Sequence, residues 1–197
     1  YIFLNMKLKS LIVALAITTG AFAQTTWKLD NSHSSVKFSV EHLMVSETEG
    51  NFKGFDGTLT SKNADFTDAE IAFTVEVKTI NTDNDMRDKH LQSDDFFNAE
   101  KFPQMKFKGT SFKKVSGNKY VLEGDLTIRD VTKKVKFDVV YRGTQKDPYG
   151  NTKAGFKATG SIKRLEYGLK WNVMTEATAV VADEVNIVIN LEYAQAK

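Results

Sequence analysis

The sequence has 197 residues, with 27 basic and 25 acidic side chains and no cysteine. The lack of cysteine excludes disulfides, thiolate metal sites and cysteine nucleophiles. The near balance of charge gives no broad electrostatic reason to bind nucleic acid or an anionic membrane. This length suits one domain with a sizeable core.

The first 23 residues have the pattern of a removable signal peptide. A short basic start at 6–9 precedes an apolar run at 11–17 and a small-x-small motif at 21–23. We expect cleavage before Gln24 and export to the periplasm, with residues 1–5 upstream of the translated protein. The apolar run is shorter than the roughly 20 residues that span a bilayer, so an uncleaved anchor is the weaker alternative. Cleavage would leave 25 basic and 25 acidic residues.

The remainder, residues 24–197, reads as a single all-β domain. Apolar and polar side chains alternate with a period of two, which is typical of strands with one buried face. Turn signals rich in glycine and asparagine separate the runs. This alternation predicts strands at 36–42, 55–59, 71–77, 105–107, 120–128, 135–141, 154–162 and 185–193.

About eight antiparallel strands with one wet face must form a sandwich or close into a barrel. Gly57, Gly109, Gly124 and Gly160 interrupt apolar faces and would let strands bend sharply or carry bulges, as closure requires. We therefore predict an extended antiparallel β-barrel, and a sandwich is the alternative.

One segment, 82–98, breaks the period of two. Thr82 is a candidate helix N-cap with Asp85 three residues later, and Pro103 stops any helix before the next strand. The pattern predicts a short helical segment near residues 83–98, ending in the paired phenylalanines Phe96 and Phe97.

Motifs for catalysis are missing. The three histidines, His33, His42 and His90, lack metal-ligand spacing, and the sequence has no nucleophile elbow, phosphate-binding glycine loop or dinucleotide fingerprint. We predict no catalytic residue, no metal and no cofactor. The alternative is a site assembled from distant strands, in which the three histidines meet in space.

The strands carry a heavy load of aromatic side chains. A barrel of about eight strands is either packed solid or holds one small ligand. The small residues Gly57, Ala154, Ala158 and Gly160 at inward positions would help to leave a cavity, and the pattern alone leaves both outcomes open. The phenylalanines with inward parity are Phe38, Phe73, Phe107, Phe137 and Phe156.

Two polar residues, His42 and Arg164, have the parity of inward side chains. A buried arginine is costly unless it is paired, so Arg164 needs an acid or an anionic ligand. We favour an internal ion pair with Asp88 or Asp30 over ligand contact. His33 and His90 are expected to be hydrogen-bonded structural residues.

Taken in order, these residues resemble the YceI-like proteins of bacterial periplasms. The resemblance covers nearly all of the chain after residue 24, with Asp130 in place of a frequent glycine and Tyr167 in place of a frequent phenylalanine. The matching blocks are 27–42, 50–57, 80–82, 86–91, 95–97, 102–103, 124–133, 155–156 and 164–168.

The resemblance implies a barrel of lipocalin type that is open to a long hydrophobic chain, with polyisoprenoid or isoprenoid-quinone ligands and, in some members, a link to stress. The leading hypothesis is a non-catalytic periplasmic carrier or store for such a lipid, without a membrane span. A homodimer is left open, as is a fatty-acyl ligand. The rivals are a lipid-modifying enzyme and an interaction protein using the outer barrel face. The ligand-binding residues are expected to be Phe38, His42, Phe73, Arg87, His90, Phe96, Phe97, Phe107, Phe137, Phe156 and Arg164.

Overall fold

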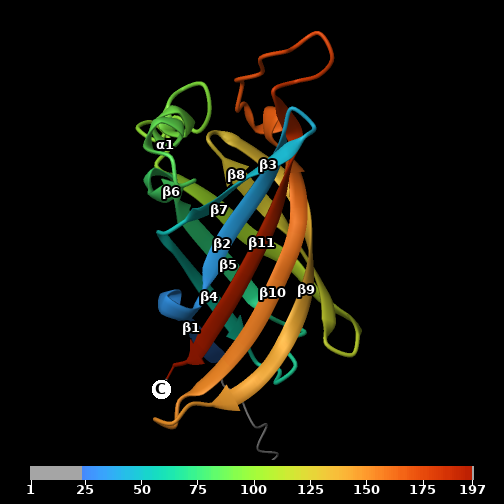
Figure 1. Ribbon diagram of the computed structural model, residues 1–197. Coiled ribbons are helices and arrows are strands. Elements are labelled where there is room, and N and C mark those ends of the chain that lie inside the picture. Colours follow the sequence, from blue (N-terminus) through green and yellow to red (C-terminus); the bar gives the residue numbers. More distant parts are fainter. Residues whose placement is uncertain (1–23, 197) are drawn as a thin grey trace, which may run out of the picture.

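The computed structural model describes residues 24–196 and consists almost wholly of antiparallel strands (Figure 1). The leader predicted at 1–23 lies outside the described residues. The strands are β1 (Thr25–Leu29), β2 (Ser35–His42), β3 (Ser46–Phe52), β4 (Phe55–Ser61), β5 (Glu70–Glu76), β6 (Ile80–Asn81), β7 (Gln104–Ser116), β8 (Lys119–Ile128), β9 (Val131–Lys146), β10 (Thr152–Lys163) and β11 (Val181–Gln195).

The described strands close into an eight-stranded barrel in the order β1-β4-β5-β7-β8-β9-β10-β11, with β1 pairing back onto β11. β2 continues the line of β1 along β11 after the 3₁₀ turn Asn31–His33, and β3 runs on into β4 after a break at 53–54. When β1 with β2, β3 with β4, and β5 with β6 are each counted as one continuous strand, every strand pairs with its neighbours in the sequence. One closing seam, between β11 and the β1–β2 strand, joins the two ends of the described chain. The predicted barrel is confirmed and the sandwich alternative is wrong.

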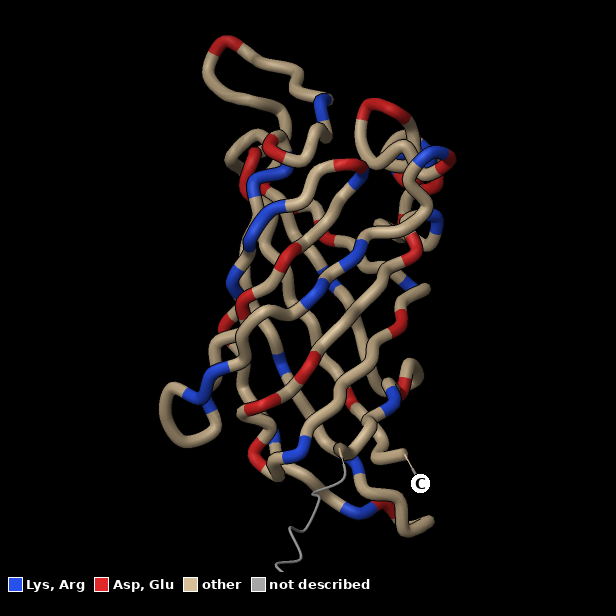
Figure 2. The backbone as a smooth tube through the Cα atoms, turned by 180° about the vertical axis from the view of Figure 1, so that it is seen from behind, with Lys and Arg blue, Asp and Glu red and all other residues tan. Residues whose placement is uncertain are grey.

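The alternation of apolar and polar residues decides which face of each strand turns inward. On β9, Phe137 and Val139 are buried while Lys136, Asp138 and Val140 are exposed. Since neighbouring side chains of a strand point to opposite faces, one face of the barrel wall is apolar and the other is wet. Figure 2 shows both signs of charge interspersed along the strands, as a neutral exterior requires.

The predicted helical segment contains α1 (Asp85–Gln92), which lies over one end of the barrel (Figure 1). The cap is Asn84, whose side chain accepts a hydrogen bond from the backbone N–H of Arg87 at 3.0 Å. The prediction of Thr82 as N-cap is wrong, because its hydroxyl instead donates to the Asp88 carboxylate at 2.6 Å. Among the described residues, no helix is long and apolar enough to cross a membrane.

The inside of the barrel differs between its two ends. Far from α1, the loop between β4 and β5 inserts Phe66, which is 2 % exposed. Its ring centroid lies 5.3 Å from that of Trp27, 5.4 Å from that of Tyr141 and 5.2 Å from that of Phe156. This aromatic cluster closes that end. At the α1 end, the apolar residues surround open space.

Candidate functional site

The open space is a cavity of about 360 Å³ in the half of the barrel nearer α1, which contributes Arg87, His90 and Leu91 to its lining. This volume falls within the range of roughly 300–1,000 Å³ that is usual for small-molecule sites. Its walls are almost wholly apolar and come from most strands of the barrel, from α1 and from the loop between β10 and β11. The cavity ends at Leu122, Phe137 and Ala158, which belong to the same hydrophobic cluster as Phe66, so access is from the α1 end.

Four wall phenylalanines each lie over a glycine. A side-chain carbon added at Gly57 would lie 2.5 Å from the ring of Phe73, and one at Gly160 would lie 2.7 Å from the ring of Phe137. Gly50 stands in the same way under Phe38, and Gly124 under Phe107. The absence of a side chain lets each ring lie against the wall. The four glycines that interrupt apolar faces in the sequence are expected to allow bends or bulges. Gly109 adjoins a register shift, as predicted, whereas Gly57, Gly124 and Gly160 make room for phenylalanine rings.

Ten of the eleven residues predicted to bind ligand line the cavity. Phe156 does not line it, because this ring packs instead against Phe66 and Tyr193 in the closed cluster. Period-two parity correctly places Phe156 inside the barrel but contains no information about depth along its axis. The residues that line the cavity are Phe38, His42, Phe73, Arg87, His90, Phe96, Phe97, Phe107, Phe137 and Arg164.

An aromatic group around His90 forms one side of the mouth. The His90 ring meets Trp171 edge-on at 5.7 Å between centroids and Phe96 at 5.1 Å, and Trp171 stacks on Phe96 at 5.8 Å. The His90 Nε2 atom lies 2.9 Å from a carboxylate oxygen of Asp95. Sequence reasoning missed Trp171, since it lies in a loop without periodicity.

Arg87, in the first turn of α1, brings a cation to the cavity. Its Nε donates to the Thr82 hydroxyl and its Nη2 to the Thr82 carbonyl, both at 2.8 Å. Asp88 accepts from the Thr82 backbone N–H at 2.9 Å. This network fixes the guanidinium beside the apolar walls, where it can meet a polar or anionic head group.

Arg164 is 3 % exposed and serves the backbone. Its guanidinium donates to the carbonyls of Ala182 at 2.8 Å, Trp171 at 2.7 Å and Val181 at 2.9 Å, and to Leu169 at 3.1 Å. Burial lowers the pKa of this guanidinium, which the charge of Asp183 partly opposes. The predicted ion pair with Asp88 or Asp30 is wrong. Backbone carbonyl groups accept the hydrogen bonds of the Arg164 guanidinium, and the residue types in the sequence do not predict such partners.

Arg129, in the turn between β8 and β9, holds the segment that follows α1 at the mouth. Its Nη1 donates to the carbonyls of Asp94 at 2.8 Å and Phe96 at 2.7 Å, and its Nη2 pairs with the Asp94 carboxylate at 2.7 Å. A third carbonyl, that of Gly168, lies 3.1 Å from Nη1. Arg129 therefore ties the α1 segment to the loop between β10 and β11.

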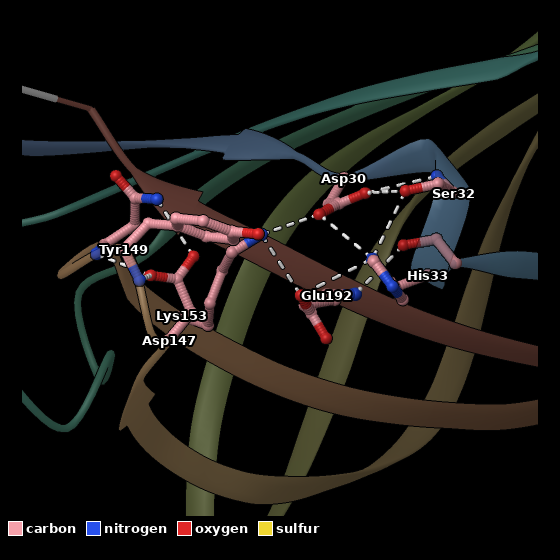
Figure 3. A network of polar contacts seen from close by, with 9 residues as sticks. Asp30, Ser32, His33, Asp147, Tyr149, Lys153 and Glu192 are labelled. Atoms are coloured by element: carbon pink, nitrogen blue, oxygen red, sulfur yellow. Dashed lines mark hydrogen bonds and ion pairs between the residues drawn. The ribbon is translucent and has the colours of Figure 1, made fainter.

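A second polar network lies far from α1, where β1, β10 and β11 meet (Figure 3). The Lys153 ammonium lies 2.6 Å from Asp30 and 3.2 Å from Glu192, and His33 lies 3.2 Å from Asp30. The Lys153 hydrogen bond holds the pKa of Asp30 well below its usual range and raises the pKa of Lys153 itself. Asp30, His33 and Glu192 could together hold a metal, but the ammonium already neutralises these carboxylates.

The three histidines do not form one cluster. His33 bonds within the Asp30 network, His90 pairs with Asp95 at the mouth, and His42 lines the cavity from the end of β2. Across residues 24–196, no hydrogen bond joins two histidines. The arrangement that would favour the enzyme alternative is therefore not formed by these side chains.

Comparison with known proteins agrees with this architecture. The YceI-like domain matches residues 27–193. The chain belongs to the YceI-like family. Protein YceI of Salmonella newport is 35 % identical over 188 residues, covering 94 % of this chain and 95 % of that protein.

Two solved structures share the fold. BcnA of Burkholderia cenocepacia superposes with a TM-score of 0.71 at 25 % identity, over 83 % of this chain and 98 % of that one. A polyisoprenoid binding domain from Saccharophagus degradans, implicated in plant cell wall breakdown, gives a TM-score of 0.66 at 14 % identity, over 86 % of this chain and 98 % of that one. The second likeness concerns the fold alone.

Proposed function

We propose that this protein binds an isoprenoid lipid of the polyprenyl or isoprenoid-quinone type in its barrel cavity and carries or stores it in the periplasm. The observation that carries the proposal is the cavity, which is apolar, closed at one end and open beside α1. The structural neighbour from Saccharophagus degradans, described as a polyisoprenoid binding domain, supports the same ligand class.

Burial of apolar surface supplies the affinity. Each Å² of apolar surface removed from water contributes roughly 25 cal/mol, so a chain of several isoprene units needs no polar anchor in its tail. Phe38, Phe73, Phe107 and Phe137 provide the walls. We propose no reaction on the ligand.

The head group lies at the mouth in this proposal. Arg87 and His42 are the polar side chains best placed for it, since both line the cavity near its open end. Arg164 contributes by holding the loop above the cavity, because its donors already serve carbonyl oxygens. Export is proposed from the signal-peptide pattern of the first 23 residues.

Mass spectrometry of an organic extract from natively purified protein tests the ligand class directly. We expect a long isoprenoid chain in the extract. In a second assay, farnesol added to delipidated protein should quench Trp171, which lines the cavity. Trp27 belongs to the closed cluster and should not respond.

Two substitutions serve as matched controls. Trp171→Phe should abolish the quenching, while Trp27→Phe should leave it intact. A protein that yields no lipid on extraction and shows no Trp171 response to farnesol would contradict the proposed function. A fatty-acyl chain in the extract would keep the binding function and correct the ligand class.

A further inference from the structure

The exposed apolar side chains gather at the mouth. Nine large apolar side chains are exposed in the described part of the chain, and most lie on the segments that surround the open end (Figure 1). Val115, Val140 and Tyr149 lie elsewhere, and Leu165, the second least exposed of the nine at 39 %, is not counted with the rim. We call the following five the mouth rim: Met44 (73 % exposed), Val45 (81 %), Met86 (81 %), Val173 (49 %) and Met174 (62 %).

The turn that presents Met44 has a conformation that its residues disfavour. The backbone N–H of Val45 donates to the His42 carbonyl at 3.1 Å, and the two central residues, Leu43 and Met44, have φ of 53° and 58°. Hairpin turns with two positive φ values strongly prefer asparagine and glycine. A large side chain at such a position raises the conformational free energy of the turn, and Met44 does not offset this by burial in the free protein. This residue choice needs a reason outside the folded monomer.

The mouth rim is continuous with the cavity wall. The Leu43 N–H donates to the Val180 carbonyl at 3.0 Å, which joins the β2–β3 turn to the loop bearing Val173 and Met174. Val180 itself lines the cavity, and Arg87, beside Met86, lines it from the opposite side. An apolar chain leaving the cavity on the Val180 side therefore passes from the apolar wall directly to the rim, while the polar side chains Arg87 and His42 lie at the same opening.

The charge around the rim shows which surface it fits. The turn 43–45 has no charged residue, and the projecting segment 173–180 has one acid and no base (Figure 2). The α1 segment 82–103 has six acidic and three basic residues. The rim is thus apolar within a weakly acidic surround, which does not attract anionic head groups.

We infer that the mouth rim docks into the interfacial region of a lipid bilayer, so that the ligand moves between bilayer and cavity without entering water. This inference rests on the proposed function. Apolar side chains inserted at the acyl boundary supply the binding free energy, and the five side chains of the mouth rim together bury enough apolar surface for reversible association. Because insertion is apolar, zwitterionic lipid is sufficient.

Flotation with phosphatidylcholine vesicles tests the inference. We expect the wild-type protein to float with the vesicles, and added phosphatidylglycerol or high salt to change the bound fraction by less than about twofold. Met44→Gly combined with Val45→Thr should reduce vesicle partitioning about tenfold or more. Val173→Thr with Met174→Ser should act in the same direction.

The first variant carries its own folding control. Glycine relieves the positive φ at position 44, and threonine has nearly the shape of valine, so the Tm should stay the same or rise. Val115→Thr with Tyr149→Ser removes exposed apolar surface away from the mouth (65 % and 86 % exposed) and should leave partitioning unchanged.

Farnesol quenching of Trp171 separates the two proposals. Rim variants that keep the quenching but lose the vesicles support docking. Wild-type protein that binds farnesol but ignores vesicles overturns docking and leaves the lipid-binding function in place. Wild-type protein that binds vesicles but not farnesol would contradict the proposed lipid-binding function and leave membrane docking in place. Vesicle binding that the rim variants do not weaken also overturns the inference. So does a wild-type protein that does not bind vesicles and forms a dimer in size-exclusion chromatography that the rim variants lose.

Discussion

At the scale of single residues, the cavity depends on positions where a side chain is missing. A phenylalanine ring placed directly over glycine covers the bare backbone and stays against the wall. Gly50, Gly57, Gly124 and Gly160 all have this role. Aromatic surface therefore lines the cavity without filling it, which neither a smooth alanine wall nor a fully packed core would achieve.

Gly50→Ala tests this role with least disturbance to the backbone. The added carbon would meet only side chains, including the Phe38 ring and the Thr82 methyl at 2.9 Å, so Phe38 must swing into the cavity. We expect the affinity for farnesol to fall about tenfold, with a stability loss of about 1–2 kcal/mol from overpacking. Gly155→Ala is the control, because its added carbon would meet only the exposed Arg142 side chain. Equal affinities for G50A and G155A would refute this role of Gly50.

Tyr167 shows the opposite case, a polar atom without a use in the fold. It is 2 % exposed, and its hydroxyl has no hydrogen-bond partner within the described chain. Burial raises its pKa to about 12, so the folded state retains a proton that the unfolded state releases above pH 10. Stability therefore falls as pH rises from about 10 to 12.

Tyr167→Phe removes both effects. We expect unfolding free energy at neutral pH to rise by about 1 kcal/mol, and the loss between pH 10 and 12 to become shallower. Tyr120→Phe is the matched control, because its hydroxyl donates to the Asp65 carbonyl at 2.8 Å and its loss should destabilise the protein. Urea denaturation at several pH values measures both. A Y167F protein less stable than wild type would mean that the hydroxyl does have a partner.

At the scale of elements, two arginines organise the loops at the mouth. Arg129 gathers the α1 segment, and Arg164 gathers the backbone of 169–182. Both do so through carbonyl oxygens, which leaves the cavity walls apolar while the loops above them stay ordered. α1 itself has no buried residue, so hydrogen bonds are its main fixed contacts, whereas the flanking segments also bury Phe96, Ala99 and Leu169.

Arg164→Met should therefore loosen one loop more than the barrel. Several carbonyls lose a charged donor, and we expect a stability loss of about 3 kcal/mol together with faster amide exchange across 169–182. Arg142→Met, at an exposed position on β9, should change neither quantity. An R164M protein with wild-type exchange in this loop would show that other contacts hold it.

The contrast between strands and loops also explains how far the sequence could be interpreted. Alternation predicted eight of the strands and the inward phenylalanines, because the buried face of a strand follows directly from a period of two, but it did not predict β1, β3 or the two-residue β6. It could not separate Phe156 from Phe137, since parity records the face and not the depth. It also missed Trp171, Arg129 and the carbonyl partners of Arg164, because loop residues meet their partners only in the folded chain.

At the scale of the whole molecule, the barrel is solid at one end and hollow at the other. The closed end contains the Phe66 cluster and the ion network of Asp30, Lys153 and Glu192. The open end consists of loops over a cavity whose apolar walls face open space. Local opening free energies should therefore differ along the barrel axis.

Hydrogen exchange followed by mass spectrometry should show this gradient. We expect slow exchange around Trp27, Tyr120 and Tyr193, and faster exchange across 82–103 and 164–180. Farnesol should slow exchange at the mouth segments and leave the closed end unchanged, because the ligand orders only what it touches. Uniform protection along the axis, or a ligand effect at the closed end, would contradict this description.

The single closing seam has a consequence for timing. β11 is the last strand made, and it pairs with β1 and β2 from the beginning of the chain as well as with β10. Before its arrival, β1 and β10 are unpaired edges and the phenylalanines have no enclosed space to face. A nascent or C-terminally truncated chain therefore has no binding site at any stage. Under the proposed function, lipid would bind only after β11 has closed the barrel, so bound lipid would report that this seam has formed.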